Sequence, residues 1–310
     1  MAREALNKGA MPPRNTPTSE GTSRTILRIS KVIQRFPGLL LVIALAVSTA
    51  AAAQSPGERL YAEHCAACHG ADRLGSMGPA LLPQNLERLR RGEALTAIRN
   101  GRLATQMPGF GDKLSADEIQ AVADHVYTPL PKVPSWDMAE IRASRIVHPD
   151  AMNLPAKPVF RADPLNVFVV VETGDHHVTI LDGDRFERLA RFPSRFALHG
   201  GPKFSPDGRF VYFASRDGWI SKYDIWNLKT VAEIRAGINT RNLAVSSDGR
   251  FLMVGNYLPH TLVALDARDL APIRVLAVKD DKGVTSRVSA VYDARPRKSF
   301  VAALTNNKEV

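Results

Sequence analysis

The sequence predicts an α + β chain in which a small all-helical domain precedes an incomplete β-propeller. Three observations support this fold class. Apolar residues recur at helical spacing between residues 54 and 130, whereas from about residue 162 the pattern becomes that of short strands and repeats. Between these regions, residues 131–161 are rich in proline, which breaks helices and predicts a linker.

Residues 1–53 predict a secretory signal peptide. An apolar run over residues 38–53 follows several basic residues, and Ala51, Ala52 and Ala53 before Gln54 form a small-residue cleavage site. The run is shorter than the roughly 20 apolar residues that span a bilayer. An uncleaved membrane anchor is therefore the alternative interpretation, and a membrane partner is expected only in that case.

The whole chain has a formal charge of +10, but the positive charge that remains without the leader is modest. Residues 1–36 carry seven Lys or Arg and two Asp or Glu, so the leader supplies about half of the positive charge. The remaining chain has neither an arginine-rich tract nor a basic helix interleaved with aromatic residues. We therefore expect no nucleic-acid partner.

Cys65, Cys68 and His69 form the C-x-x-C-H signature of covalent c-type haem. Two thiols one helical turn apart can each form a thioether to the same porphyrin edge, and the adjacent histidine then ligates the iron. A redox-active C-x-x-C pair and a disulfide are the alternatives. These are the only two cysteines and the histidine follows at once, which favours haem. Such haem is attached outside the bacterial cytoplasm, so we expect a periplasmic protein.

Three helices are predicted in this first domain. Residues 56–61 lead into the haem motif, residues 86–98 form a second helix ended by Asn100 and Gly101, and a third begins after Ser115. Ser115 and Glu118 have the spacing of a capping box. The predicted buried face of the third helix comprises Ile119, Val122, Ala123 and Val126.

Met107 is the predicted sixth ligand of the haem c iron. A methionine thioether is the usual partner of histidine in a haem that carries electrons, and a Pro/Gly-rich loop can present Met107 to the metal. Met77, eight residues after His69, is the rival, and core packing of Met107 is the other alternative. The haem motif, residues 78–79 and residues 107–110 occur in the order found in class I cytochrome c, which this domain resembles.

The second region contains three copies of a strand pair. The copies are residues 167–171 with 177–182, 210–214 with 220–224, and 251–255 with 261–266. Their final aspartates, Asp182, Asp224 and Asp266, are 42 residues apart, and Asp-Gly turns precede the second and third copies. A period near 42 with four short strands is typical of a propeller blade. An unrelated β-sandwich would not explain copies in register.

The repeat places candidate binding residues on one propeller face. His199, Arg241 and Arg287 fall in loops between blades, and Arg216 and Tyr257 fall in turns within blades. An imidazole with several guanidiniums suits an iron tetrapyrrole that carries carboxylates, because histidine binds the metal and arginine forks bind the acid groups. Solvated surface side chains are the alternative.

Both domains together resemble the cytochrome cd1 family, in which an eight-bladed propeller holds haem d1. The matching motifs are residues 197–200, 215–218, 223–226, 236–241 and 256–259. The resemblance implies that His199 is the proximal ligand of the d1 iron and that Arg216 and Arg241 face the haem carboxylates. It also assigns Arg195, Arg287 and Tyr257 to the haem d1 periphery.

Within this family, residues 175–177 and 192–201 look more like the branch that acts in haem d1 biosynthesis. That branch oxidises dihydro-haem d1 to haem d1 in the periplasm, and its haem c takes the electrons. The resemblance thus implies haem c and a d1-type tetrapyrrole as cofactors, and periplasmic electron donor or acceptor proteins as partners. A nitrite reductase that makes nitric oxide is the alternative, and a non-enzymatic electron carrier is another.

The resemblance also exposes a departure from the family pattern. An eight-bladed propeller needs more strands than the three to four blades that fit in residues 162–310. We therefore expect a C-terminally truncated chain. The catalytic residues of the distal side are unknown and are expected beyond Val310.

Overall fold

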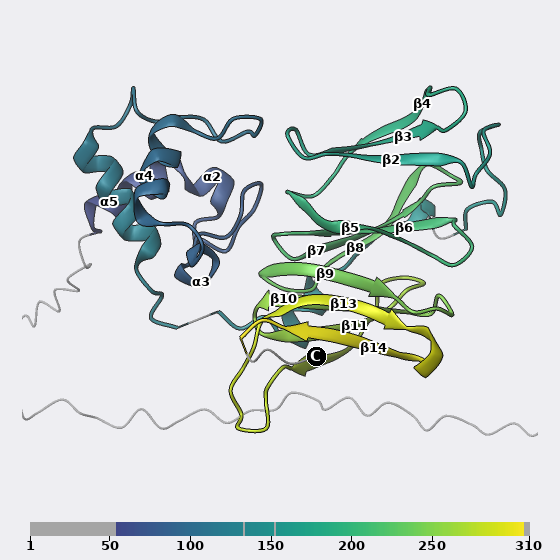
Figure 1. Cartoon of the computed structure of the whole chain (residues 1–310). Coiled ribbons are helices and arrows are strands. Elements are labelled where there is room, and N and C mark those ends of the chain that lie inside the picture. Colours follow the sequence, from purple (N-terminus) through teal and green to yellow (C-terminus); the bar gives the residue numbers. More distant parts are fainter. Residues whose placement is uncertain (1–53, 133, 152, 307–310) are drawn as a thin grey trace, which may run out of the picture. The chain divides into compact units, whose positions relative to one another are not determined.

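The structure is a computed structural model that describes residues 54–132, 134–151 and 153–306 (Figure 1). The predicted signal peptide, residues 1–53, lies outside the described residues. Among the described helices, none is long and apolar enough to cross a membrane.

The first domain contains five helices. They are α1 (Pro56–His64), α2 (Ala66–His69), α3 (Pro83–Leu86), α4 (Arg91–Asn100) and α5 (Ala116–Tyr127). The prediction of one helix over residues 86–98 is wrong, because α3 ends at Leu86 and α4 begins at Arg91. A new start is possible there because Glu93 accepts a hydrogen bond from the backbone N–H of Arg90, at 3.1 Å.

Helix α5 confirms the predicted capping box. The Ser115 hydroxyl accepts a hydrogen bond from the Glu118 N–H at 3.3 Å, and the Glu118 carboxylate accepts one from the Ser115 N–H at 2.8 Å. The predicted apolar face is buried, since Ile119 and Val122 are each 1% exposed. Both pack with Leu60 of α1, so the helix that carries the haem motif rests on α5.

The second region consists of antiparallel sheets that follow one another in chain order (Figure 1). The first is β2 (Val167–Glu172), β3 (His177–Asp182) and β4 (Arg188–Pro193). The second is β5 (Leu198–Phe204), β6 (Phe210–Ser215), β7 (Trp219–Asp224) and β8 (Lys229–Arg235). The third is β9 (Asn239–Val245), β10 (Phe251–Leu258), β11 (Thr261–Asp266) and β12 (Pro272–Ala277), and the fourth is β13 (Val288–Ala294) with β14 (Ser299–Leu304).

The register of these sheets confirms the 42-residue repeat. Asp182, Asp224 and Asp266 end β3, β7 and β11, and each pairs with the first residue of the preceding strand. The Asp-Gly turns are built alike, because Ser205 and Ser246 each accept a hydrogen bond at 2.9 Å from the N–H that begins the next strand. The second and third sheets therefore each contain the four repeat strands of a propeller blade, whereas the first has three strands and the fourth has two.

Apolar side chains join each sheet to the next. Val178 and Ile180 of β3 pack with Val211 and Tyr223 of the second sheet, and all four are almost fully buried. Further cores lie between the second and third sheets and between the third and fourth. Each sheet thus buries its apolar face only against its neighbour, as propeller blades do.

The proline-rich segment contains more regular structure than the linker prediction implied. It forms α6 (Met138–Ala143), the short strand β1 (Ile146–Val147), which pairs with β8, and a 3-10 turn, η1 (Pro149–Ala151). Ile141 of α6 is fully buried against the second sheet and its neighbours. Asp137 and Glu140 cap this helix, and their spacing is the sequence signal that the proline content obscured.

Candidate functional site

The haem-binding motif lies where α1 turns into α2. Cys65 joins the two helices, and His69 is the last residue of α2, so a single turn presents both thiols and the imidazole. The His69 Nδ1 lies 2.8 Å from the carbonyl oxygen of Pro79. Because a carbonyl only accepts, Nδ1 carries the proton, and the lone pair of Nε2 is free for a metal.

The pKa values of the motif favour haem attachment over a redox-active thiol pair. Burial, followed by the neighbouring Cys68, raises the pKa of the Cys65 thiol to about 11. A redox-active C-x-x-C pair instead needs a lowered thiol pKa, which is the opposite direction. Burial also lowers the pKa of His69, while its bond to Pro79 acts the other way, so the imidazole is neutral at pH 7.

The loop after the motif is shaped around the imidazole. A Cβ on Gly78 would lie 2.7 Å from the Cε1 atom of His69, so only glycine fits beside the ring. Arg73, 4% exposed, donates hydrogen bonds to the carbonyls of His125 and Thr128, at 2.6 and 3.0 Å. The loop that follows the motif is thereby fixed to the end of α5.

The two candidate methionines differ in burial. Met107 is half-buried in a tight loop, where its carbonyl accepts a hydrogen bond from the Arg102 N–H at 3.1 Å. Met77 is 55% exposed. The choice of Met107 as the sixth ligand thus stays a prediction, to which the half-buried side chain adds support.

The structure brings His199 and Arg241 together across two sheets. The Nδ1 of His199, in β5, lies 3.1 Å from the carbonyl oxygen of Arg241, in β9. The geometry matches that of His69, because Nδ1 again donates to a carbonyl and Nε2 keeps its lone pair. Burial lowers the pKa of His199, and the hydrogen bond to the Arg241 carbonyl acts in the opposite direction. The positive charges of Arg241 and Arg216 lower this pKa further.

Arg216 and Arg241 supply positive charge that the described residues do not neutralise. Neither guanidinium forms an ion pair or a hydrogen bond with a described side chain. Burial and then the charge of Arg241 lower the pKa of Arg216. Two cations that affect each other's pKa therefore lie near an imidazole. Binding of an iron-containing molecule with negatively charged groups would stabilise this arrangement.

Tyr257 lies between two guanidiniums. The guanidinium carbons of Arg241 and Arg287 are 5.4 and 5.3 Å from the centre of its ring, within the range of cation–π contacts. Arg287 also donates to the carboxylate of Glu87 and, at 3.1 Å, to Asn306 Oδ1. Unlike Arg216 and Arg241, it already has an acidic partner. His199, Arg241 and Tyr257 lie within strands, in β5, β9 and β10, rather than in the loops and turns that the repeat suggested.

Arg195 is not brought into this group. Its Nε and Nη2 atoms each donate to a carboxylate oxygen of Glu233 at 2.8 Å, and its guanidinium lies 3.8 Å from the Trp219 ring centre. The Arg195 guanidinium, which was expected to bind a haem carboxylate, thus already binds the Glu233 carboxylate. Its assignment to the haem d1 periphery remains an untested prediction that this geometry does not favour.

Two residues near the group carried no clear signal in the sequence. Lys203 donates to the carbonyls of Gly200 and Gly201, at 2.5 and 3.1 Å, and so holds the loop that follows His199. Asp217, next to Arg216, is 2% exposed, and burial raises its pKa to about 6. Its position within a turn would ordinarily indicate an exposed carboxylate.

The donor sets fit the two expected tetrapyrroles. Two thiols and an imidazole in one turn match a covalent haem c, and an imidazole with two unpaired guanidiniums matches an iron tetrapyrrole with carboxylate side chains. Among the described residues, no group of three or more His, Cys, Asp or Glu side chains is placed to hold a metal ion. Each of the two donor sets is a candidate site for a haem-like group.

Comparison with known families divides the chain in the same way. Residues 162–310 match the family described as "Cytochrome D1 heme domain". Residues 52–126 match the family "Cytochrome C oxidase, cbb3-type, subunit III", which places the first domain with that group of c-type cytochromes. The predicted combination of a cytochrome c domain with a haem d1-type propeller is confirmed.

Two curated relatives cover most of the chain. A "Dihydro-heme d1 dehydrogenase" of Pseudomonas aeruginosa is 58% identical over 276 residues, which are 89% of this chain and 56% of the relative. A "Nitrite reductase" of Stutzerimonas stutzeri is 26% identical over 292 residues, 85% of this chain and 50% of the relative. The chain thus spans about half the length of the curated relatives it matches.

A solved structure is also similar. It is titled "Dihydro-heme d1 dehydrogenase NirN in complex with DHE" and has a TM-score of 0.75 and 62% sequence identity. The match covers 81% of this chain and 54% of that one. Sequence and structure comparisons therefore agree on one group of relatives.

Proposed function

Because the chain belongs to the cytochrome cd1 family, we propose that it is a periplasmic c-type cytochrome that oxidises dihydro-haem d1 in haem d1 biosynthesis. Cys65 and Cys68 hold a covalent haem c, whose iron His69 and Met107 ligate. The propeller face binds the tetrapyrrole, with His199 on its iron and Arg216 and Arg241 on its carboxylates. Arg287 and Tyr257 border this site.

The observation that carries the proposal is the hydrogen bond between His199 Nδ1 and the Arg241 carbonyl. It fixes the imidazole with Nε2 available, beside two guanidiniums that lack acidic partners among the described residues. A solvated surface histidine has no need of such a bond. Strand β5, strand β9 and the turn after β6 thus supply the proposed metal ligand and the groups proposed to bind carboxylates.

Electron balance requires a further partner. Conversion of the dihydro form to haem d1 removes two hydrogen atoms from the macrocycle, which amounts to two electrons and two protons. A single haem c accepts one electron at a time. One turnover therefore needs two transfers through haem c, and a periplasmic electron-acceptor protein must reoxidise it after each.

Sequence identity favours the dehydrogenase assignment over nitrite reduction, since it is 58% to the dehydrogenase and 26% to the nitrite reductase. Nitrite reductase remains the second candidate, because the relative of that name matches 85% of this chain, including parts of both domains. A non-enzymatic carrier is the third. The predicted signal peptide and the exported chemistry of haem c attachment support a periplasmic location.

The test is a titration of dihydro-haem d1 into the haem c-loaded chain, followed by visible spectroscopy. His199→Ala is expected to change the spectrum of the bound iron. Arg216→Gln and Arg241→Gln are expected to weaken binding tenfold to a hundredfold, since a shielded Arg–carboxylate pair contributes about 1.5–3 kcal/mol. His177→Ala is the matched control, because His177 begins β3 and its Nδ1 lies 3.0 Å from the Asp175 carbonyl oxygen, away from Arg241.

Identical spectra and affinities for the wild type and His199→Ala would contradict the proposed site. Binding with the expected spectrum but no oxidation, when an artificial electron acceptor is present, would contradict the dehydrogenase activity and favour the carrier. Reduction of nitrite by the loaded chain would instead favour the second candidate.

A further inference from the structure

A cavity of about 900 Å³ lies between the second and third sheets, at the strand ends opposite His199. In β5 and β6, Leu198 pairs with Ser215 at the His199 end, whereas Phe204 pairs with Val211 at the cavity end. The cavity is lined by the turns of residues 205–210, 248–251 and 266–268 and by β7. It is therefore separate from the proposed tetrapyrrole site.

The lining contains four cations, and three of them have a carboxylate partner. Arg209 pairs with Asp224 at 2.7 Å, Arg250 with Asp248 at 2.7 Å, and Arg268 with Asp266 and Asp269 at 3.9 and 3.8 Å. The fourth cation is Lys222. Among the described residues no carboxylate oxygen lies within 4.0 Å of its ammonium.

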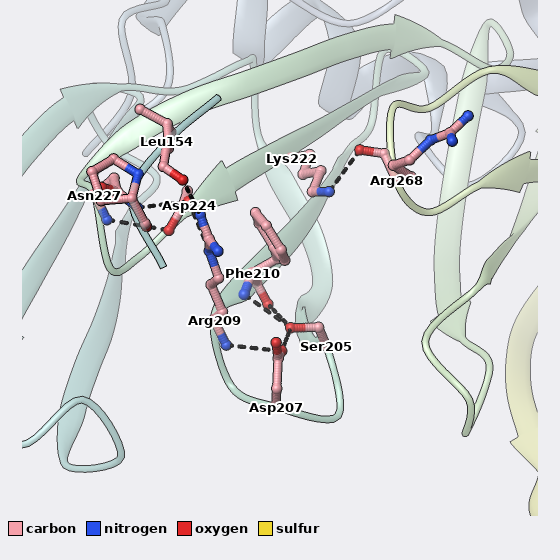
Figure 2. Close-up of polar contacts among 10 residues, drawn as sticks. Leu154, Ser205, Asp207, Arg209, Phe210, Lys222, Asp224, Asn227 and Arg268 are labelled. Carbon is pink, nitrogen blue, oxygen red and sulfur yellow. Dashed lines mark hydrogen bonds and ion pairs between the residues drawn. The ribbon is translucent and has the colours of Figure 1, made fainter. Parts of the chain in front are cut away.

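Lys222 is buried with most of its hydrogen-bonding capacity unused. It is 3% exposed, and its Nζ donates to the carbonyl of Arg268 at 2.7 Å and lies 3.7 Å from the Phe210 ring centre (Figure 2). An ammonium has three N–H donors, so two remain without an acceptor among the described residues. The charges of Asp224, Asp266 and Asp269 favour the protonated amine from beyond hydrogen-bond distance. A buried ammonium whose donors lack acceptors is nevertheless costly.

The repeat shows that the fold itself does not require an amine at this position. The equivalent residues of β3 and β11, two positions before the final aspartates, are Ile180 and Ala264. Ile180 is fully buried in the core between the first and second sheets. Lys222 thus replaces an apolar residue of the repeat at the one junction that has this cavity.

The carboxylates of the lining are already engaged. Asp224 accepts from Arg209 and from the Asn227 side chain, at 2.7 and 3.0 Å, and Asp207 accepts from the Ser205 hydroxyl at 2.5 Å (Figure 2). Asp266 accepts from the Arg268 N–H at 2.7 Å. The lining thus balances its four cations with Asp207, Asp224, Asp248 and Asp266, and what it leaves unused is the N–H donors of Lys222 rather than a net positive charge.

We propose that this cavity binds a small organic carboxylate whose oxygens accept the two remaining N–H donors of Lys222. Cavities of 300–1,000 Å³ usually hold organic molecules rather than simple ions, so the volume favours an organic anion over phosphate. Arg250 and Arg268 are 72% and 79% exposed, and their side chains can turn toward a second acid group. Burial also lowers the pKa of Lys222 to about 8, so the amine is mostly protonated at pH 7 and can bind an anion.

The experiment measures binding of radiolabelled succinate to the haem c-loaded full chain by equilibrium dialysis at pH 7. Acetate and inorganic phosphate are unlabelled competitors at matched ionic strength. We expect saturable binding of one succinate, weaker competition by acetate and none by phosphate. Lys222→Met is expected to weaken binding at least tenfold, and Lys229→Met, which removes an exposed lysine of the same sheet, is expected to leave it unchanged.

A thermal unfolding measurement without ligand separates binding from a structural role. Since the repeat has Ile180 at this position, Lys222→Met should be at least as stable as the wild type. A lower midpoint would assign Lys222 to a structural hydrogen bond with Arg268 and overturn the proposal. Absence of saturable succinate binding, equal binding by Lys222→Met, or binding of phosphate alone would overturn it as well.

Discussion

Two histidines of this chain are oriented in the same manner, with Nδ1 bonded to the backbone and Nε2 open. Each donates from Nδ1 to a backbone carbonyl, His69 to Pro79 at 2.8 Å and His199 to Arg241 at 3.1 Å. Burial lowers the pKa of both imidazoles, so both are neutral at pH 7 with an available Nε2 lone pair. The hydrogen bond sets both the tautomer and the ring orientation before any metal arrives.

The axial methionine gives a prediction at the residue scale. In the ferric, haem-loaded protein, Met107→Ala is expected to abolish the weak near-infrared band of a Met–iron bond, because it removes the thioether. Met77→Ala, at a side chain that is 55% exposed, is expected to retain the band. Near-infrared absorption of both variants is the measurement. Loss of the band in Met77→Ala alone would show that the ligand assignment is reversed.

At the residue scale, the sequence predicts a shared role most directly where the chemistry is local. Cys65, Cys68 and His69 are adjacent, so their shared role is visible in the sequence. The state of Lys222 is not visible there, because its burial depends on a turn of another sheet. Arg195 was expected beside His199, yet its Glu233 partner lies 38 residues away on β8. Partners brought in by tertiary folding cannot be inferred from spacing alone.

At the element scale, the turn that carries Arg216 is built around a close backbone approach. Gly218 has a φ of +94°, and a Cβ at this position would lie 1.7 Å from the carbonyl oxygen of Gly237. Its N–H donates to Ser215, and its carbonyl accepts from Ala236 at 2.8 Å. The two segments that flank the proposed site are thus in direct contact, and only glycine fits between them.

Substitution of Gly218 by alanine should therefore destabilise the fold by more than the strain of a positive φ alone. We expect Gly218→Ala to lower the free energy of unfolding by about 3 kcal/mol or more, through both strain and the clash with Gly237. Gly283→Ala is the matched control, since Gly283 has a φ of +79° but open space around the position of its Cβ. It should cost only about 1–2 kcal/mol. Urea unfolding compares the two, and equal costs would refute the steric argument.

The repeat made strands easier to predict than helices. The aspartates that end the second strand of each pair recur every 42 residues and the two Asp-Gly turns are 41 apart, so each copy supports the assignment of the others. The helices had no such support. Residues 86–98 were predicted as one helix, although Leu86 and Arg91 belong to different ones. Helix α6 was not predicted, because its capping signal lies among prolines and its stability comes from the burial of Ile141.

At the scale of the whole molecule, the propeller region is held together by apolar cores between consecutive sheets. Ile220 of β7 is fully buried in the core that also contains Leu252 and Val263 of the third sheet. Within this core the hydrogen bonds run mainly along each sheet, so side-chain packing carries most of the adhesion between sheets. Stability of one sheet should depend on the presence of the next.

This dependence predicts the effect of a cavity between sheets. Ile220→Ala is expected to lower the free energy of unfolding of the propeller by about 2–5 kcal/mol, because it leaves a void against the third sheet. Ile273→Ala, at a residue that is 49% exposed, should cost less than about 1 kcal/mol. Far-ultraviolet circular dichroism during urea unfolding measures both. The haem c absorbance per chain should be unchanged, and similar costs for both variants would contradict the role of the inter-sheet core.

The hydrogen bond from His199 to Arg241 also ties the geometry of the propeller site to a long stretch of chain. His69 and its acceptor Pro79 are ten residues apart, so the first imidazole is oriented by its own segment alone. His199 is oriented by a carbonyl 42 residues further along the chain, on a strand of the third sheet. A change that unpairs β9 should therefore release the His199 imidazole while His69 stays oriented.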